Sequence, residues 1–164
     1  MSEELSTQPP ARQIALQRIY LKDASVEVPL APQVFTRQWN PQLDVQVGTA
    51  TAALGNDIHQ VMLTVTVTAK LGDETGFLVE VHQAGIFQVS GFVSEIDIQA
   101  ILAGYCPGVI FPFAREAVAD LVQRSGFPPV LLQPINFEAL YAEHLARSRE
   151  QSATAGNAVT GTVQ

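Results

Sequence analysis

Few side chains in this sequence are of the types that bind metal ions or act as catalytic acids and bases. The three histidines are His59, His82 and His144, and none has a second ligand-type residue at the i+3 or i+4 spacing of a helical metal pair. The carboxylates Glu116 and Asp120 are one helical turn apart, a spacing that the solvated face of a helix explains. The sequence therefore predicts no metal site and no catalytic acid–base pair.

The single cysteine, Cys106, excludes a disulfide framework. It stands between a short helical pattern and a turn, without a basic neighbour that would favour its thiolate, so we expect a buried structural thiol. The chain also lacks a phosphate-binding glycine loop, a dinucleotide fingerprint and a Gly-x-Ser-x-Gly elbow. These features predict a protein that is not an enzyme, uses no ATP and needs no cofactor.

Composition narrows the class of protein. The 164 residues suit one domain, and a net charge of −7 with only nine Lys and Arg argues against nucleic acid. The N-terminus has neither a basic nor an apolar signal region, and no apolar run approaches a membrane span, so we expect a soluble cytoplasmic protein without membrane insertion. With 47% hydrophobic and 15% charged residues, part of the surface should be covered by oligomerisation or ligands.

Alternation of apolar and polar residues predicts four strands. The first has a phase change, which indicates a bulge or bend near Lys22. Gly-rich clusters beside the third strand predict hairpins. The four strands are expected at 17–28, from Leu43 through Val47, at 61–68 and at 75–90.

A period of 3.6 residues follows the strands. Ser94 resembles an N-cap for a short helix that Gly104 and Pro107 would end, and Pro112 suits the first turn of a longer helix ending at Gly126. Asn136 would cap a last helix. Strands followed by helices predict an α+β domain, with an antiparallel sheet covered on one face by two principal helices. We assign residues 1–12 to a disordered arm, 13–147 to the domain and 148–164 to a flexible tail.

The segment from Glu27 to Pro41 has three prolines around Val34, Phe35 and Trp39, so large apolar side chains lie where regular strand pairing is prevented. Burial of a side chain such as Phe stabilises the protein by roughly 1.5–3 kcal/mol, so these residues should be covered. The pattern leaves two possibilities open: permanent cover by the core, or cover by a ligand on demand.

Four long segments, in this order and spacing, resemble the SecB protein-export chaperone family. They read QRIYLKDASVEVPLAPQVF (17–35), TVTAKLGDETGFLVEVHQAGIF (66–87), YCPGVIFPFAREAV (105–118) and FPPVLLQPINFEALY (127–141). The likeness covers residues 13–146. It implies four antiparallel strands, a crossover segment between strands 1 and 2, and two principal helices. It also implies a homotetramer, built as a dimer of dimers, that holds unfolded secretory precursors in the cytoplasm without ATP and delivers them to the translocation ATPase SecA.

The resemblance also implies roles for individual residues. A groove for unfolded chains would include Val34, Phe35 and Trp39. The surface that receives the basic, zinc-containing end of SecA would comprise Asp23, Glu27, Leu78 and Glu80. Subunit association would depend on Val79, Val81 and Gln83.

Two alternatives remain open from the sequence. A small enzyme would need convergent titratable groups in a cleft. A non-catalytic adaptor would bind one folded partner through an acidic sheet face. The tail SATAGNAVTGTVQ departs from the acidic ends of some SecB relatives, which argues against an auxiliary tail contact with SecA.

Overall fold

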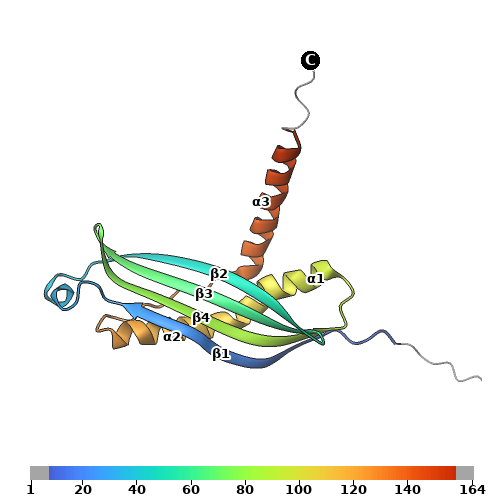
Figure 1. Cartoon of the computed structure of the whole chain (residues 1–164), viewed down its shortest axis with the longest axis horizontal. Coiled ribbons are helices and arrows are strands. Elements are labelled where there is room, and N and C mark those ends of the chain that lie inside the picture. The colour runs from blue at the N-terminus through green and yellow to red at the C-terminus, as the bar shows by residue number, and fades with distance from the viewer. Residues whose placement is uncertain (1–7, 158–164) are drawn as a thin grey trace, which may run out of the picture.

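The computed structural model describes residues 8–157 and is built around a four-stranded antiparallel sheet in the order β1-β4-β3-β2 (Figure 1). The strands are β1 (Gln13–Glu27), β2 (Gln42–Gly55), β3 (Ile58–Leu71) and β4 (Glu74–Ser90). The predicted α+β class and four strands are confirmed. β1 and β2 are the two edge strands, and the segment that connects them, which we call the crossover segment (28–41), passes around the end of the sheet.

The predicted irregularity near Lys22 is present in β1. Leu21 pairs with Gln83 and Asp23 pairs with His82, so Lys22 is an extra residue without a partner of its own on β4. Because side chains alternate between the two faces of a strand, this bulge changes which residues of β1 face the core. It allows Asp23 and Glu27 to point away from the core.

Hairpins join β2 to β3 and β3 to β4, as predicted. Asn56 and Asp57 have φ angles of 53° and 60°, and Gly72 has a φ of 64°. Left-handed conformations of this kind suit the tight turns between antiparallel strands, and Gly, Asn and Asp tolerate them best.

The predicted break between the short and the long helix is wrong. Ser94 caps α1 (Glu95–Ala100) by accepting a hydrogen bond from the Asp97 amide, as expected, but the chain continues through a π-helical turn (Ile101–Tyr105) into α2 (Cys106–Arg124). Pro107 lies in the first turn of α2, where its missing N–H costs little. Gly104 is tolerated inside the turn. The long helix thus begins six residues before Pro112, which lies in its interior.

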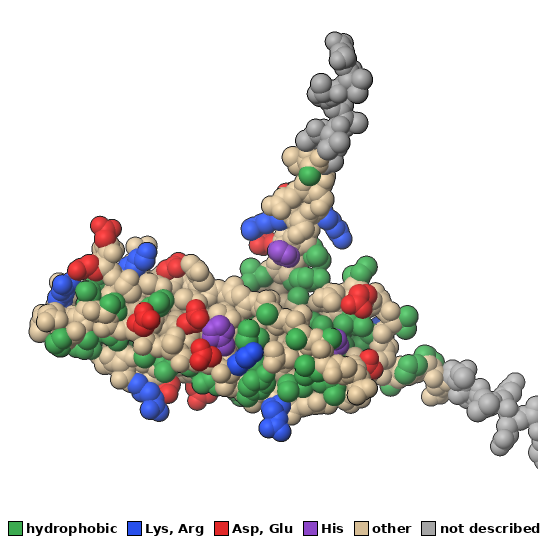
Figure 2. Space-filling view, viewed as in Figure 1, with side chains coloured by type: hydrophobic (Ala, Val, Ile, Leu, Met, Phe, Trp, Pro, Cys, Tyr) green, Lys and Arg blue, Asp and Glu red, His purple; other side chains and the backbone are tan. Residues whose placement is uncertain are grey.

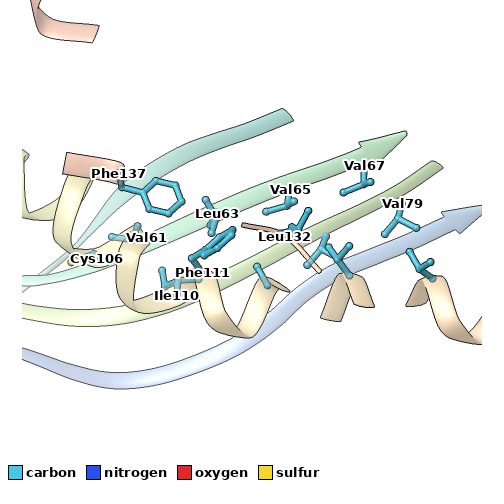
Figure 3. Packing of buried hydrophobic residues seen from close by; sticks show 14 of the residues in the cluster. Val61, Leu63, Val65, Val67, Val79, Cys106, Ile110, Phe111, Leu132 and Phe137 are labelled. Atoms are coloured by element: carbon cyan, nitrogen blue, oxygen red, sulfur yellow. The ribbon is translucent and has the colours of Figure 1, made fainter. Parts of the chain in front are cut away.

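The core lies between the sheet and α2 (Figure 3). Alternate residues of β3 and β4 point toward the helix, and one α2 side chain in every four points back. The buried α2 residues at this spacing are Cys106, Ile110, Ala114, Val118 and Val122. Phe113 is 45% exposed, because it lies roughly 100° around the helix from Ala114, on the side away from the buried Phe111.

α3 (Phe137–Asn157) begins at the core and then projects away from the sheet (Figure 1). The Asn136 side chain accepts a hydrogen bond from the Ala139 amide, so the predicted cap is confirmed. Phe137 is buried, whereas most later residues are exposed. Residues 148–157, which we assigned to the tail, continue this helix, and the rest of the tail and the start of the N-terminal arm lie outside the described residues.

Candidate functional site

The crossover segment lies against the core through an aromatic cluster formed by Phe35, Trp39, Phe77 and Phe127. The Trp39 ring is 4.3 Å from the Phe127 ring and 5.9 Å from the Phe77 ring, and the Phe35 and Phe127 rings are 5.2 Å apart. Such offset and tilted arrangements are favourable for aromatic side chains. The cluster joins the crossover segment to β4 and to the segment that follows α2.

The three apolar residues of the crossover segment have different environments. Val34 is 2% exposed and belongs to the core, Trp39 is partly buried, and Phe35 is 51% exposed. Cover by the core therefore accounts for Val34, and cover of Phe35 and Trp39 by a ligand stays a prediction. Phe35 and Trp39 thus keep surface exposed to solvent, whereas Val34 is covered by the core.

An apolar groove runs from Trp39 along the edge strand β2. It consists of three adjoining hollows of about 290, 390 and 280 Å³. Leu43 and Leu131 line both the first and the second hollow, and Val47 lines both the second and the third. One wall is β2 and the other is the extended segment 128–135, continued by the first turns of α3.

The edge position of β2 explains why this groove is apolar and open. Leu43, Val45 and Val47 pair with Ala69, Val67 and Val65 of β3, whose side chains form the buried face of the sheet. The β2 side chains continue that face beyond the region that α2 covers, so Leu43 and Val45 remain 45% and 41% exposed. The sheet thus offers a strip of core-like surface to solvent.

The opposite groove wall is irregular because of its prolines. Pro128, Pro129 and Pro134 lack the N–H groups that a strand or helix interior requires, so the segment cannot pair with β2. Leu132 anchors it in the core near Phe111 (Figure 3), while Leu131 is 74% exposed beside the groove. The sequence pattern did not predict that either wall lines a groove. The alternation of β2 was visible, but only the sheet order reveals that this apolar face lacks a covering helix.

The four residues expected to receive SecA lie together on the sheet face turned away from α2. Glu27 is paired with Leu78, and Ser25, two residues earlier, is paired with Glu80. Asp23 follows on the same face, so the four form one acidic surface across β1 and β4. Acidic side chains gather on the left half of the sheet face seen in Figure 2, and more hydrophobic side chains lie on the right half.

A polar network holds Glu80 in this acidic surface. One Glu80 oxygen lies 2.8 Å from His82 Nε2, and the other accepts a hydrogen bond from the Thr66 hydroxyl at 3.2 Å. The His82 contact lowers the pKa of Glu80 more than partial burial raises it, so the carboxylate form is favoured. Glu80 therefore presents a negative charge that its neighbours hold in place.

The residues expected at the subunit interface lie inside the subunit. Val79 and Val81 are fully buried beneath α2, and Gln83 is 5% exposed. None of them reaches the surface of a single chain. An influence on association would therefore act through the position of α2, which packs directly on β4.

The predicted structural role of Cys106 agrees with its surroundings. Its side chain is fully buried, and this burial raises the pKa of the thiol to about 12. Such a thiol is almost entirely protonated at neutral pH and is a poor nucleophile. Within residues 8–157, no three His, Cys, Asp or Glu side chains are grouped as metal ligands would be.

Comparison with known proteins supports one family. A family model described as preprotein translocase subunit SecB matches residues 7–148. The protein-export protein SecB of Chromobacterium violaceum is 51% identical over 158 residues, which are 96% of this chain and 100% of that protein. The protein of the same name from Nitrosococcus oceani is 47% identical over 156 residues, 94% of this chain and 93% of that protein.

A solved structure shares the fold. A SecB-like chaperone from Mycobacterium tuberculosis, solved in complex with a peptide from an antitoxin, superimposes with a TM-score of 0.61. The match covers 74% of this chain and 87% of that one, at 20% sequence identity. Together with the family model and the close relatives, which match nearly the full length, the arrangement of sheet, crossover segment and helices shows that the chain belongs to the SecB family.

Proposed function

We propose that this protein holds unfolded preproteins in the apolar groove, without ATP, and passes them to SecA. The observation that supports this proposal most strongly is the groove itself, a strip of core-like side chains that no element of the described chain covers. A folded protein has already buried its apolar side chains, whereas an unfolded chain offers them along its whole length. Hydrophobic burial is not directional, so the groove would select unfolded chains without reading their sequence.

Val45 allows a direct test of the groove. Val45→Asp would place a charge in the middle of the apolar wall, and because the side chain is 41% exposed, the substitution should leave the fold intact. Gln46→Asp adds the same charge one residue away, on the opposite face of β2, and is the matched control. Retention of an unfolded preprotein should fall at least tenfold in Val45→Asp and stay near the wild-type value in Gln46→Asp. Equal retention in both variants would contradict the proposal.

The acidic surface is proposed to bind SecA. Three carboxylates in a row that begins beside Leu78 suit a basic partner segment, because opposite charges speed the encounter and an aliphatic side chain next to them can be buried at the contact. Asp23→Ala, Glu27→Ala and Glu80→Lys should each weaken SecA binding while preserving preprotein retention. Glu143→Ala, which removes an exposed carboxylate from α3, is the control. Calorimetric titration at two salt concentrations checks this, since a charged interface loses affinity as salt rises.

Assembly into a tetramer is proposed from the apolar surface that remains uncovered. The continuous helix from Glu95 to Arg124 is long and apolar enough to cross a membrane by length and composition, yet only 33% of its most apolar 18-residue window is buried. Tyr105, Val109 and Phe113 recur every four residues along it and retain exposed surface. The edge strand β1 also exposes Leu16 and Leu21 by 45% and 50%. Two such surfaces would suit the two interfaces of a dimer of dimers.

Phe113→Glu is a sharper test of assembly than a charge at Val81, because Val81 is fully buried and a charge there would unfold the chain. Sedimentation should show a tetramer for the wild type and smaller species for Phe113→Glu. Glu116→Gln, on the same helix, should remain tetrameric. A monomeric wild type at micromolar concentration would overturn the proposed assembly.

The proposed place of action is the cytoplasm, because preproteins are unfolded and accessible to SecA before they cross the membrane. Several grooves on one tetramer would engage a long chain together, which can raise avidity by roughly 10²–10⁴ over a single groove. Affinity would then arise without sequence specificity and without a nucleotide cycle.

A further inference from the structure

The acidic surface contains a histidine to which the proposed function gives no role. His82 lies between the carboxylate of Glu80, 2.8 Å from its Nε2, and the hydroxyl of Thr64, 3.1 Å from its Nδ1. Its side chain is 24% exposed, against 42% for Glu80. The ring is therefore ordered by two contacts and still reaches solvent within the surface proposed to meet SecA.

Charged groups face His82 from two strands. On β4, Glu80 contacts the ring directly. On β1, Asp23 stands opposite His82 in the strand register, and Lys22 occupies the bulge beside it. Tyr20 follows on the same face of β1 but is engaged with Gln60, so its phenol is directed across the sheet rather than toward the imidazole.

On the other side of His82, strands β3 and β2 place no charged residue next to the imidazole ring. Thr64 stands opposite His82 on β3, and Thr66 stands opposite Glu80. Beyond them on β2, Gly48 pairs with Thr64 and Gln46 pairs with Thr66. The local charge therefore depends on Asp23, Glu80 and Lys22, and on whether His82 carries a proton.

We propose that His82 is a further member of the partner-binding surface and that its protonation weakens the binding of a basic partner. The inference rests on the proposed role of this surface in binding SecA. Imidazole is the side chain whose charge ordinarily changes between pH 5 and 8. A proton on His82 would pair with Glu80 and cancel one of the three negative charges contributed by Asp23, Glu27 and Glu80, leaving less attraction for basic side chains.

Thermodynamic linkage between proton binding at His82 and partner binding fixes the sign of the pH effect on affinity. A basic partner binds better when His82 is neutral, so partner binding and proton binding oppose each other, and association releases protons from the surface. Affinity should fall as the pH falls from 8 to 6. One charge at an exposed contact changes affinity by roughly fivefold, which sets the expected size of the change.

The test is calorimetric titration of SecA into the full chain at pH 8.0 and pH 6.0, at constant ionic strength. His82→Gln keeps a hydrogen-bonding side chain but cannot take up a proton, and His59→Gln removes a histidine from the opposite face of the sheet and serves as the control. The dissociation constant at pH 6.0 divided by that at pH 8.0 should be about fivefold larger for the wild type and His59→Gln than for His82→Gln. Changes in the protonation of SecA itself cancel in this comparison.

Buffers of different ionisation enthalpy provide a second readout, because they report the protons released on binding. The wild type should release more protons on binding than His82→Gln when both are compared at the same pH between 6.0 and 8.0. Equal affinity ratios and equal proton release in the two proteins would overturn the inference, although binding itself would still support the proposed partner surface. Absence of SecA binding by the wild type at both pH values would overturn the proposed partner, and the inference with it.

Discussion

Cys106 illustrates how the surroundings of one residue decide its chemistry. The fully buried thiol has a pKa raised to about 12 by burial, so its nucleophilic thiolate form is scarce at physiological pH. We predict that native protein at pH 8 reacts with a thiol reagent such as Ellman's reagent far more slowly than the same protein in guanidinium chloride. The absorbance of the released thiolate measures both rates. Comparable rates in the two conditions would show that Cys106 is accessible and that its structural role is wrong.

The surroundings of Glu80 in the acidic surface lower its pKa. Its pKa is lowered first by the contact with His82, while partial burial opposes the effect and Thr66 adds to it. His82→Ala should therefore raise the pKa of Glu80, and Thr66→Val should raise it less. Titration of the side-chain carboxyl carbon by NMR measures both changes. A larger effect of the threonine substitution would contradict this order of causes.

The sign of the pH dependence follows from the same contacts. Because the pKa of Glu80 is lower in the folded protein than in the unfolded chain, its ionised form favours folding. This contribution is fully present above the ordinary pKa of a glutamate. It is lost as the pH falls through the lowered pKa of Glu80 in the folded protein. His82→Ala should reduce this contribution, so the variant should lose less stability than the wild type when both are compared between neutral and acidic pH.

Among the helices and strands, the features that depend on neighbouring residues could be predicted from the sequence, whereas those that depend on the pairing of distant segments could not. The bulge near Lys22, the Ser94 and Asn136 caps and the two hairpins depend on neighbouring residues, and each was visible in the sequence. The start of α2 was not, because Pro107 was interpreted as an end although a proline also fits a first turn. The apolar groove depends on β2 being an edge strand, which the pattern of β2 itself does not reveal.

Substitutions in the crossover segment should distinguish an effect on preprotein binding from an effect on the stability of the fold. Phe35 is 51% exposed, so Phe35→Ala should weaken retention of an unfolded preprotein and change the melting temperature little. Trp39 packs on Phe77 and Phe127, so Trp39→Ala should weaken retention by roughly 1–3 kcal/mol and also lower the melting temperature. Binding assays paired with calorimetric melting distinguish the two. A loss of stability without any loss of retention in both variants would assign the segment to the core alone.

The first turn of α3 depends on its cap. The Asn136 side chain accepts a hydrogen bond from the Ala139 amide at 3.0 Å, and Phe137 beside it is buried. Asn136→Ala should lower the free energy of unfolding by about 0.5–2 kcal/mol, whereas Asn136→Asp should retain the cap and most of the stability. Urea unfolding measures both. Equal destabilisation by the two substitutions would mean that the cap is not the source of the effect.

At the scale of the whole molecule, the two proposed binding surfaces lie on different sides of one sheet. The apolar groove continues the face that α2 covers, whereas the acidic surface occupies the opposite face. A preprotein and SecA would therefore compete little for space, and a charge change on one face should leave the other unaffected. This arrangement would allow a carrier to dock on SecA before it releases its preprotein.

The proposed function requires that the apolar groove retains unfolded preproteins. The most direct measurement dilutes a chemically unfolded preprotein into buffer with the full chain, without ATP, and follows both proteins by size-exclusion chromatography. We predict that the preprotein elutes together with this protein and stays sensitive to protease, whereas the same preprotein allowed to fold first elutes alone. Val45→Asp should largely abolish the shared elution, and Gln46→Asp should preserve it. If the unfolded preprotein elutes separately from the wild type and folds at its unassisted rate, the account is contradicted.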